Sequence, residues 1–375
     1  MTAAITGVGA LSSVGGSSAE IFAALCAGKS GIGEPKGFDL TRYRTRHAFE
    51  IDDRPAPGVD VPLRATRWLE RVVVDALADA GLPERLDDVP VLIGTTLREI
   101  RSVELMWRDK AEFALADLHF GTALRKRFGA TRTYTVANAC SASLYALGLG
   151  VDLLATGTAD TVVVAGVDTI SESTYGLLDR CYPVAPRRLQ PFDRARAGML
   201  QGEGAAAVVL SREPVGRVHA TVTGVAVNCD AYHPSAPHAA SIAAAVREAH
   251  CRAGTVAEDI DLVLLHGTGT ELNDEAEALV MREVFGSGGP LMTAMKCMTG
   301  HTAGASGLHS LLVAVESMRA GVVPPITTLD DPMPEAAGLR LVRDTAAPGS
   351  LRRAQVDSFG FGGLNAVAVI ERPRE

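Results

Sequence analysis

The sequence predicts an α/β fold built from two similar halves. Strand-like apolar runs alternate with amphipathic helical patterns along the whole 375-residue chain. The run at 161–166 is apolar without polar alternation, which is typical of a strand in a parallel sheet that is covered on both faces. Cys140, which precedes one apolar helix, is echoed by the glycine-rich stretch 299–306, which precedes another. These observations indicate a duplicated unit with helices on both faces of its sheets and an active site between the halves.

The first half is expected to begin with a short apolar strand over 3–9 that ends in glycines. Ser17 and the residues after it open a helix through Ala27, and Gly28 ends it. The other elements expected in this half are, in order, a possible strand near 48–51, an amphipathic helix over 63–80, a buried strand over 89–94, a helical stretch over 99–128, a short buried strand over 134–137, the helix after Cys140, and strands over 161–166 and 205–210.

The second half repeats the alternation of strands and helices. Its expected elements are a long β pattern over 218–227, a helix over 239–253, a strand over 262–265, a helix over 271–285, a strand near 291–294, a helix over 305–320, and β runs over 354–358 and 366–370. We place the boundary between the halves at 211/212, so the units are 1–211 and 212–375. Because no long linker separates them, independent movement of the halves is not expected.

Composition and charge exclude several classes of protein. The formal net charge of −8 disfavours nucleic acid as a partner. The six cysteines show no CxxC pair and no clustered metal-ligand spacing, which favours a reduced, cytoplasmic setting without a metal site. No apolar run reaches the roughly 18 to 20 residues of a membrane span, and the first residues lack the basic region of a signal peptide. We therefore expect no membrane partner.

Cys140 is the candidate nucleophile. It lies between the strand 134–137 and a mostly apolar helix, in or near the first helical turn. Unpaired N–H groups and the positive end of the helix dipole stabilise an anion there, which favours loss of the thiol proton. Small neighbouring residues leave room for a substrate. By itself the pattern also fits an ordinary core cysteine. The remaining cysteines are expected to be structural thiols: Cys26, Cys181, Cys229, Cys251 and Cys297.

Two histidines stand in glycine-rich turns. His266 directly follows the buried strand 262–265, at the sheet edge where α/β proteins gather ligands. His301 stands in a second glycine turn before the helix 305–320. Each histidine alone also fits a structural residue hydrogen-bonded within its turn. The combination with Cys140 favours a catalytic site over three unrelated coincidences.

Five sequence blocks together resemble the elongating β-ketoacyl-acyl carrier protein synthases of the thiolase superfamily. The blocks, in the family's order, are residues 139–143, 191–204, 266–270, 296–301 and 358–365. The resemblance covers nearly the whole chain, including residues 6–9 at its start. It implies the thiolase fold, in which duplicated βαβαβαββ halves form a five-layered αβαβα arrangement.

The resemblance implies a Cys-His-His site and a condensing reaction. Cys140 would take an acyl group from the phosphopantetheine thioester of an acyl carrier protein. A malonyl thioester would then lose carbon dioxide, and neutral His266 and His301 would stabilise the enolate oxygen by donating N–H groups. The resulting carbanion would attack the acyl-Cys140 carbonyl. A second oxyanion hole would consist of the backbone N–H groups of Cys140 and Phe361, and Phe361 would also gate the entry of acyl chains.

The same resemblance assigns supporting roles to residues around the histidines. Lys296 would be buried and ion-paired with Glu277, with Asp274 as a nearby acid. Thr268 and Thr270 match hydroxyls that hold the pantetheine arm, although both also fit ordinary turn residues. Phe359 belongs to the same glycine-rich loop as Phe361 and is expected to contact substrate. The reaction needs no cofactor beyond the carrier's own phosphopantetheine.

An acidic carrier protein requires a basic patch on this net-negative chain. Arg64, Arg67 and Arg71 lie at helical spacing on one face, where the family docks its carrier. A solvated arginine face is the alternative. The segment Arg125 to Arg127 is a weaker candidate. The resemblance also implies a dimer, either of two identical chains or with a second ketosynthase-like subunit.

The chain departs from the family in its length and therefore leaves other functions open. Family members usually exceed 400 residues, and the stretches 94–130 and after His233 are compressed here. One alternative is a ketosynthase-like acyltransferase or cyclase that passes the acyl group of Cys140 to another nucleophile without decarboxylation. Another is a carrier-binding subunit of a heterodimeric synthase. A degradative thiolase is disfavoured because no cysteine follows Cys297.

Overall fold

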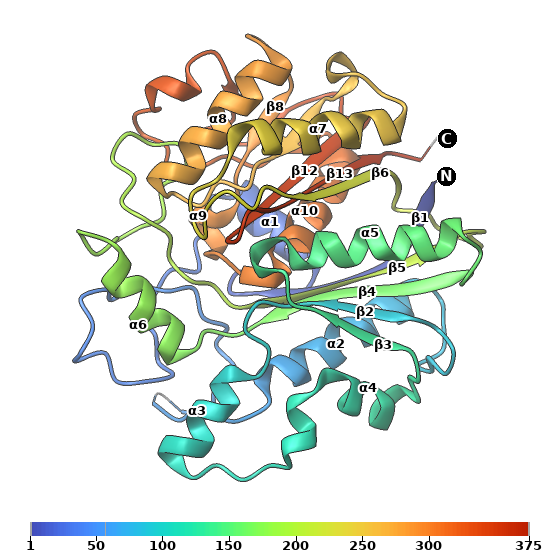
Figure 1. Ribbon diagram of the computed structural model, residues 1–375, viewed down its shortest axis with the longest axis vertical. Coiled ribbons are helices and arrows are strands. Elements are labelled where there is room, and N and C mark those ends of the chain that lie inside the picture. Colours follow the sequence, from blue (N-terminus) through green and yellow to red (C-terminus); the bar gives the residue numbers. More distant parts are fainter. Residues whose placement is uncertain (1, 57, 374–375) are drawn as a thin grey trace.

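The computed structural model describes residues 2–56 and 58–373, and it folds into two equivalent halves stacked on each other (Figure 1). The first half contains β1 (Ala3–Ser12), α1 (Ser18–Cys26), α2 (Arg64–Asp79), β2 (Val91–Gly94), α3 (Ile100–Asp109), α4 (Phe120–Phe128), β3 (Thr133–Val136), α5 (Ala142–Ala155), β4 (Thr161–Asp168), α6 (Glu172–Cys181) and β5 (Gly204–Ser211). The second contains β6 (Ala220–Cys229), α7 (Ala239–Ala253), β7 (Leu262–Leu264), α8 (Glu271–Phe285), β8 (Leu291–Thr293), α9 (Lys296–Thr299), α10 (Ser306–Ala320), β9 (Val322–Val323), β10 (Arg340–Leu341), β11 (Ala347–Pro348), β12 (Arg353–Gly360) and β13 (Leu364–Glu371).

Strand pairing shows the duplication directly. In the first half the order is β3-β2-β4-β5-β1, and in the second β8-β7-β12-β13-β6, with β10 added beside β8. In each half the first three strands of this order run parallel to one another. The fourth strand pairs antiparallel with both the third and the fifth. A short antiparallel contact between β1 and β6 joins the two sheets. The strand over 161–166 was expected in a parallel sheet, but β4 is parallel only to β2 and antiparallel to β5, so the sheet is mixed.

The helices form three layers around the two sheets, which gives the five-layered thiolase arrangement. Helices α5 and α10 lie in the middle layer and contact strands of both sheets. Helices α2 and α4 cover the outer face of the first sheet, and their apolar side chains form one core cluster with its strands. Helices α7 and α8 lie on the opposite outer side, over the second sheet. Most side chains of the middle layer are apolar because sheets cover it on both sides, although Leu149 of α5 is exposed.

Three local expectations were wrong. The helical stretch over 99–128 is interrupted, because Lys110 ends α3 in a left-handed conformation (φ 56°) before α4 begins. Within 48–51 there is no strand, and only Ala48 and Phe49 form isolated bridges. The strand expected to be buried before Cys140 is β3, an edge strand whose Tyr134 is 49% exposed. Within the described chain, β3 has only β2 as a neighbour in the sheet, so one edge has no partner.

Arg64 lies in the core, which corrects its expected role in carrier docking. Only 2% of its surface is exposed, and its guanidinium donates to Glu203 at 2.9 Å and to Asp53 at 2.7 Å. Burial alone would lower the pKa of Arg64, but the surrounding carboxylates raise it above its usual value. The residue cannot contact a partner protein because its guanidinium is enclosed by Ile51, Asp53, Asp60 and Glu203. It is a structural anchor between α2 and β5.

We predict that Arg64→Ala lowers the free energy of unfolding by about 3 to 5 kcal/mol, because it removes one of the two buried guanidiniums, Arg64 and Arg54, that pair with the Glu203 carboxylate. Urea unfolding followed by circular dichroism measures the loss. Arg67→Ala is the matched control, since Arg67 lies on the same helix but is exposed. Its effect should stay within about 0.5 kcal/mol. Equal stability of the two variants would contradict the anchoring role.

Candidate active site

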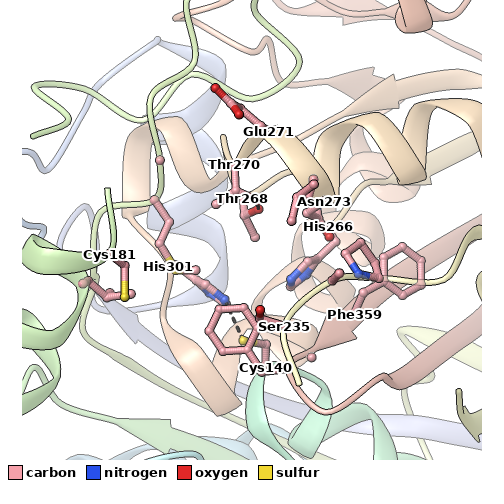
Figure 2. A pocket seen from close by; sticks show the side chains of 18 of the residues that line it. Cys140, Cys181, Ser235, His266, Thr268, Thr270, Glu271, Asn273, His301 and Phe359 are labelled. Atoms are coloured by element: carbon pink, nitrogen blue, oxygen red, sulfur yellow. Dashed lines mark hydrogen bonds between the residues drawn. The ribbon is translucent and has the colours of Figure 1, made fainter. Parts of the chain in front are cut away.

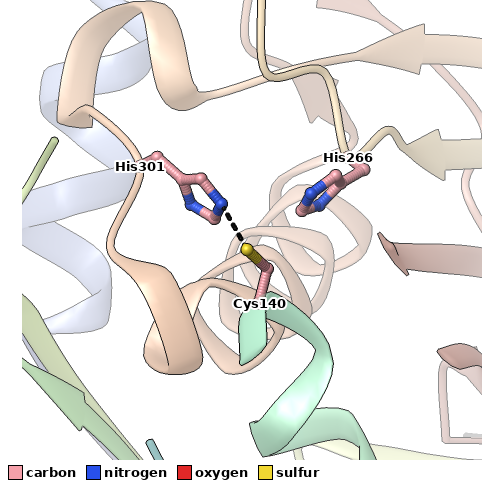
Figure 3. Close-up of side chains that lie close together, drawn as sticks. All are labelled: Cys140, His266 and His301. Atoms are coloured by element: carbon pink, nitrogen blue, oxygen red, sulfur yellow. Dashed lines mark hydrogen bonds between the residues drawn. The ribbon is translucent and has the colours of Figure 1, made fainter. Parts of the chain in front are cut away.

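Cys140, His266 and His301 converge from both halves of the chain (Figure 3). Cys140 lies in a short 3₁₀ turn directly before α5, His266 follows β7, and His301 follows α9. His301 Nε2 lies 3.0 Å from Cys140 Sγ. One ligating atom from each of the three residues lies within 4.8 Å of the others, and all three side chains are buried. The structure thus brings the predicted Cys-His-His residues together.

A strained joint and two serines fix the position of Cys140. Ala139 has φ 48°, a left-handed conformation that costs free energy in a residue other than glycine. The carbonyl oxygen of Cys140 accepts hydrogen bonds from Ser358 Oγ at 2.9 Å and Ser306 Oγ at 3.3 Å. The joint therefore depends on β12 and on the N-terminus of α10, which both belong to the second half.

Two carboxylates of α8 hold the turn that carries His266. Glu277 accepts from the backbone N–H groups of His266 at 2.6 Å and Gly267 at 2.9 Å. Asp274, almost one turn earlier on the helix, accepts from those of Thr268 and Gly269 at 3.1 Å each. Both carboxylates are fully buried, so the turn gives them the donors that they would otherwise find in water.

Lys296 is buried as expected, but it forms no direct ion pair with Glu277. No Lys296–carboxylate contact within 4.0 Å occurs among the described residues, and the two charges interact at longer range. The Glu277 oxygens are instead occupied by backbone N–H groups. Lys296 Nζ donates to the carbonyl of His266 and lies 3.4 Å from its Nδ1. An ammonium at Nδ1 favours the tautomer with the ring proton on Nε2, the nitrogen left free to face a substrate.

Burial controls the protonation of the site, which corrects the expectation of an acidified thiol. Desolvation raises the pKa of Cys140 to about 11, although the Lys296 charge and the backbone N–H groups of Phe361 and Cys140 act in the opposite direction. Burial and the nearby Lys296 hold the pKa of His266 and of His301 well below the usual range. The pKa of Lys296 itself falls to about 8 for the same reason, burial. At neutral pH a neutral thiol therefore faces a neutral imidazole, and Cys140 Sγ–H donates to His301 Nε2.

A largely apolar cavity of about 420 Å³ opens onto the three side chains (Figure 2). Phe359, Thr268 and Thr270 line it, and the two threonine hydroxyls lie 2.9 Å apart. Phe361 stands at the rim with half of its surface exposed, while its backbone N–H is directed at Cys140 Sγ. Their expected roles in binding and gating stay predictions.

Sequence patterns missed the wall of this cavity opposite Phe359. It comes from the end of α6 and the segment after it, with Leu178, Cys181 and Tyr182, and from Met199 before β5. Cys181 was expected to be a structural thiol but lines the cavity and is exposed. The one sequence signal for this wall was the glycine at position 198. In the structure Gly198 has φ +135° and lies under the Tyr182 ring.

Two of the three arginines proposed for carrier docking remain on the surface. Arg67 and Arg71 are exposed and donate to the backbone carbonyls of Pro62 and Gly16. Arg71 also lies 3.8 Å from Asp75, which offsets part of its charge. Docking at these two residues stays a prediction.

The structure contains no helix, within the described residues, that is long and apolar enough to cross a membrane. Cys140, His266 and His301 also form the one group of described His, Cys, Asp and Glu residues close enough to hold a metal ion. Zinc accepts such a donor set, so assays of the protein need a chelator control.

Both halves of the chain match known sequence families. Residues 2–215 match the family described as "Beta-ketoacyl synthase, N-terminal domain", and residues 219–330 match "Beta-ketoacyl synthase, C-terminal domain". The chain is 30% identical to the tetracenomycin polyketide synthase ketoacyl synthase alpha subunit of Streptomyces glaucescens, over 99% of this chain and 97% of that protein. It is 28% identical to 3-oxoacyl-[acyl-carrier-protein] synthase 2 of Vibrio cholerae serotype O1, over 98% of each.

Solved structures agree with this assignment. The structure titled "The ishigamide ketosynthase/chain length factor" superposes with a TM-score of 0.90 at 29% sequence identity, covering 100% of this chain and 99% of that chain. A type II polyketide synthase ketosynthase in complex with its acyl-carrier protein has a TM-score of 0.89 at 19% identity, covering 99% of each chain, and supports the fold alone.

We predict that alkylation of Cys140 by iodoacetamide accelerates about tenfold per pH unit through neutral pH and up toward pH 11. The thiolate is the reactive form, and the raised pKa keeps it scarce below that value. Mass spectrometry of the Cys140 peptide gives the rate. Below about pH 8 Lys296→Met should slow alkylation further, because the Lys296 charge, present only there, stabilises the thiolate. A rate that levels off below pH 8 would contradict the neutral resting thiol.

Proposed function

Because the chain belongs to the β-ketoacyl synthase family, we propose that it elongates an acyl group on Cys140 by decarboxylative condensation with a malonyl thioester. Acyl carrier protein presents both thioesters, and the setting is fatty-acid or polyketide biosynthesis. The observation that carries the proposal is the convergence of a buried thiol and two neutral imidazoles in one cavity. No resident cofactor takes part, because the side chains supply the nucleophile and the hydrogen-bond donors.

In the first step, Cys140 Sγ attacks the carbonyl carbon of the acyl thioester. The new S–C bond forms as the bond to the pantetheine sulfur breaks. The thiol proton moves through His301 Nε2, 3.0 Å away, to the departing pantetheine sulfur. Because the pKa of His301 is far below neutral, the imidazole passes the proton on and does not hold it. The backbone N–H groups of Cys140 and Phe361, which interact with the sulfur, would stabilise the carbonyl oxygen as it gains charge.

In the second step, the malonyl group loses carbon dioxide, and the electron pair of the broken C–C bond forms an enolate. Its oxygen would accept a hydrogen bond from His266 Nε2–H, and a second from His301 in the tautomer that carries the ring proton on Nε2 instead of Nδ1. The proton on His266 Nε2 follows from the position of Lys296 beside Nδ1. The enolate carbon then attacks the acyl-Cys140 carbonyl and forms the new C–C bond. Cys140 leaves as a thiolate and takes one proton from solvent, the proton that decarboxylation of the malonyl carboxylate consumes, which completes the cycle.

Acyl transfer without decarboxylation is the competing function. It would use Cys140 and His301 in the same way but would give His266 and Lys296 no task. Three buried charged side chains, those of Lys296, Glu277 and Asp274, position His266 and the turn that carries it. That arrangement favours condensation over simple transfer. A subunit that only binds the carrier protein would need none of these groups.

The exposed edge of the first sheet supports the proposed dimer. Tyr134 on β3 and Leu149 on α5 are 49% and 47% exposed, beside an edge strand without a partner in the described chain. We assign this face to a second ketosynthase-like subunit, by analogy with the ishigamide ketosynthase/chain length factor. Arg67 and Arg71 remain the proposed contact for the carrier protein.

Intact-mass measurements separate these functions. We expect acyl-carrier protein to add the acyl mass to the wild-type chain at Cys140, and malonyl-carrier protein to release carbon dioxide and a β-ketoacyl product. Cys140→Ala should abolish acylation and formation of the β-ketoacyl product. His266→Ala should keep acylation but lower condensation by about 10² to 10³, the usual loss for one oxyanion donor. His119→Ala, an exposed histidine before α4, is the matched control. Acylation of the wild type without carbon dioxide would replace condensation by acyl transfer.

We predict that Tyr134→Arg with Leu149→Glu converts the assembled protein to single subunits, because it places charges in a closely packed apolar contact. Light scattering after size exclusion measures the mass. Val256→Arg, at an exposed position in the other half, should leave the mass unchanged. A wild-type chain that is monomeric alone would rule out the homodimer and leave a different second subunit.

A further inference from the structure

We propose that Tyr182 and Met199 close the inner end of the catalytic cavity and restrict Cys140 to short acyl groups. The inference rests on the proposed function and adds the class of substrate. Both residues line the same cavity as Cys140, on the wall formed by the end of α6 and the segment before β5, and Figure 2 shows their neighbour Cys181 on that side. An acyl chain attached to Cys140 Sγ would extend toward this wall.

A second, much smaller cavity lies directly behind the wall. Leu178, Tyr182 and Met199 line both cavities, so these three side chains separate them. The rear cavity has a volume of about 10 Å³, which is room for one water molecule and not for an alkyl chain. It borders Gln201, whose buried Oε1 has no hydrogen-bond partner among the described residues. A water there would satisfy this oxygen, whereas an alkyl chain would not.

The wall is held rigidly, so it cannot easily swing aside. A Cβ on Gly198 would lie 2.8 Å from atoms of the Tyr182 ring, which shows how closely the ring packs on the backbone. The Met199 N–H donates to the Tyr182 hydroxyl, whose pKa burial raises to about 12. Helix α6, which ends just before Tyr182, is anchored at its start because Glu104 accepts from the backbone N–H groups of Glu172 and Ser173.

The cavity between Cys140 and the wall is small for the end of a pantetheine arm together with an acyl group. Pockets for small molecules range from about 300 to 1,000 Å³, and this cavity of about 420 Å³ lies near the lower limit. Under the proposed function it must hold both the end of the pantetheine arm and the acyl group. Little volume then remains beyond Cys140, which limits the acyl group to a few carbons.

The test uses the full chain and saturated acyl-carrier thioesters from acetyl to dodecanoyl. Competition between donors, read as the mass added at Cys140, gives the ratio of kcat/KM for long and short chains. We expect the wild type to prefer short chains and Tyr182→Ala to raise the long-to-short ratio at least tenfold, the size of effect that one methylene can produce in an apolar pocket. Tyr182→Phe, which keeps the ring, should retain the wild-type preference.

Two further variants keep the test decisive. Val184→Ala changes an exposed apolar residue on the same segment, outside the cavity, and should leave the ratio unchanged. If Tyr182→Ala does not fold, Met199→Ala opens the same wall without removing the ring from Gly198, and should raise the ratio in the same direction.

The outcomes for this inference and for the proposed function are distinct. A wild type that accepts dodecanoyl as well as butyryl, or opened variants that load normally with unchanged preference, would overturn the inference alone. A wild type whose Cys140 takes no acyl group from any donor would overturn the proposed function, and the inference with it.

Discussion

The structure depends on bringing the N-terminal ends of two buried helices together in the middle layer. Helices α5 and α10 each begin after a short 3₁₀ turn, and each turn starts at an alanine in a left-handed conformation, Ala139 (φ 48°) and Ala303 (φ 47°). The helices approach so closely that a Cβ on Gly307 would lie 2.6 Å from the Leu144 side chain. The same strained joint therefore occurs in both halves, and in the first it presents Cys140. Strain of this kind persists only where the surrounding structure holds it.

Burial of this joint decides how the site can work. A helix N-terminus favours an anion, yet the enclosed position costs the thiolate more than the nearby donors return, so the pKa of Cys140 rises to about 11. The same burial keeps both imidazoles neutral. Under the proposed function, neutral imidazoles would donate to an enolate oxygen and carry a proton transiently. Desolvation thus keeps the two imidazoles neutral, and it also keeps most of Cys140 in the thiol form at neutral pH.

A network of buried ion pairs connects the core to α6 and the cavity wall. Arg64 pairs with Glu203, the residue directly before β5. Arg101 pairs with Asp60 at 2.8 Å and with Glu104 at 3.0 Å. Glu104 in turn accepts from the first N–H groups of α6. Removing one partner of a buried pair is costly, so this network fixes α6 and with it the wall of the cavity. Residues far from Cys140 thereby shape the space beside it.

Local patterns in the sequence predicted the alternation of strands and helices and the duplication, and they singled out Cys140, His266 and His301 as candidates, because helical periodicity and glycine turns are encoded by neighbouring residues. Helices α7 and α8 occur with the predicted bounds for that reason. Tertiary structure decided what depends on distant groups. The protonation of Cys140, the burial of Arg64, the absence of a direct Lys296–Glu277 pair in the described chain and the wall formed by Tyr182 and Met199 all follow from enclosure by segments remote in sequence. Desolvation and cavity shape are properties of that enclosure, and no local pattern carries them.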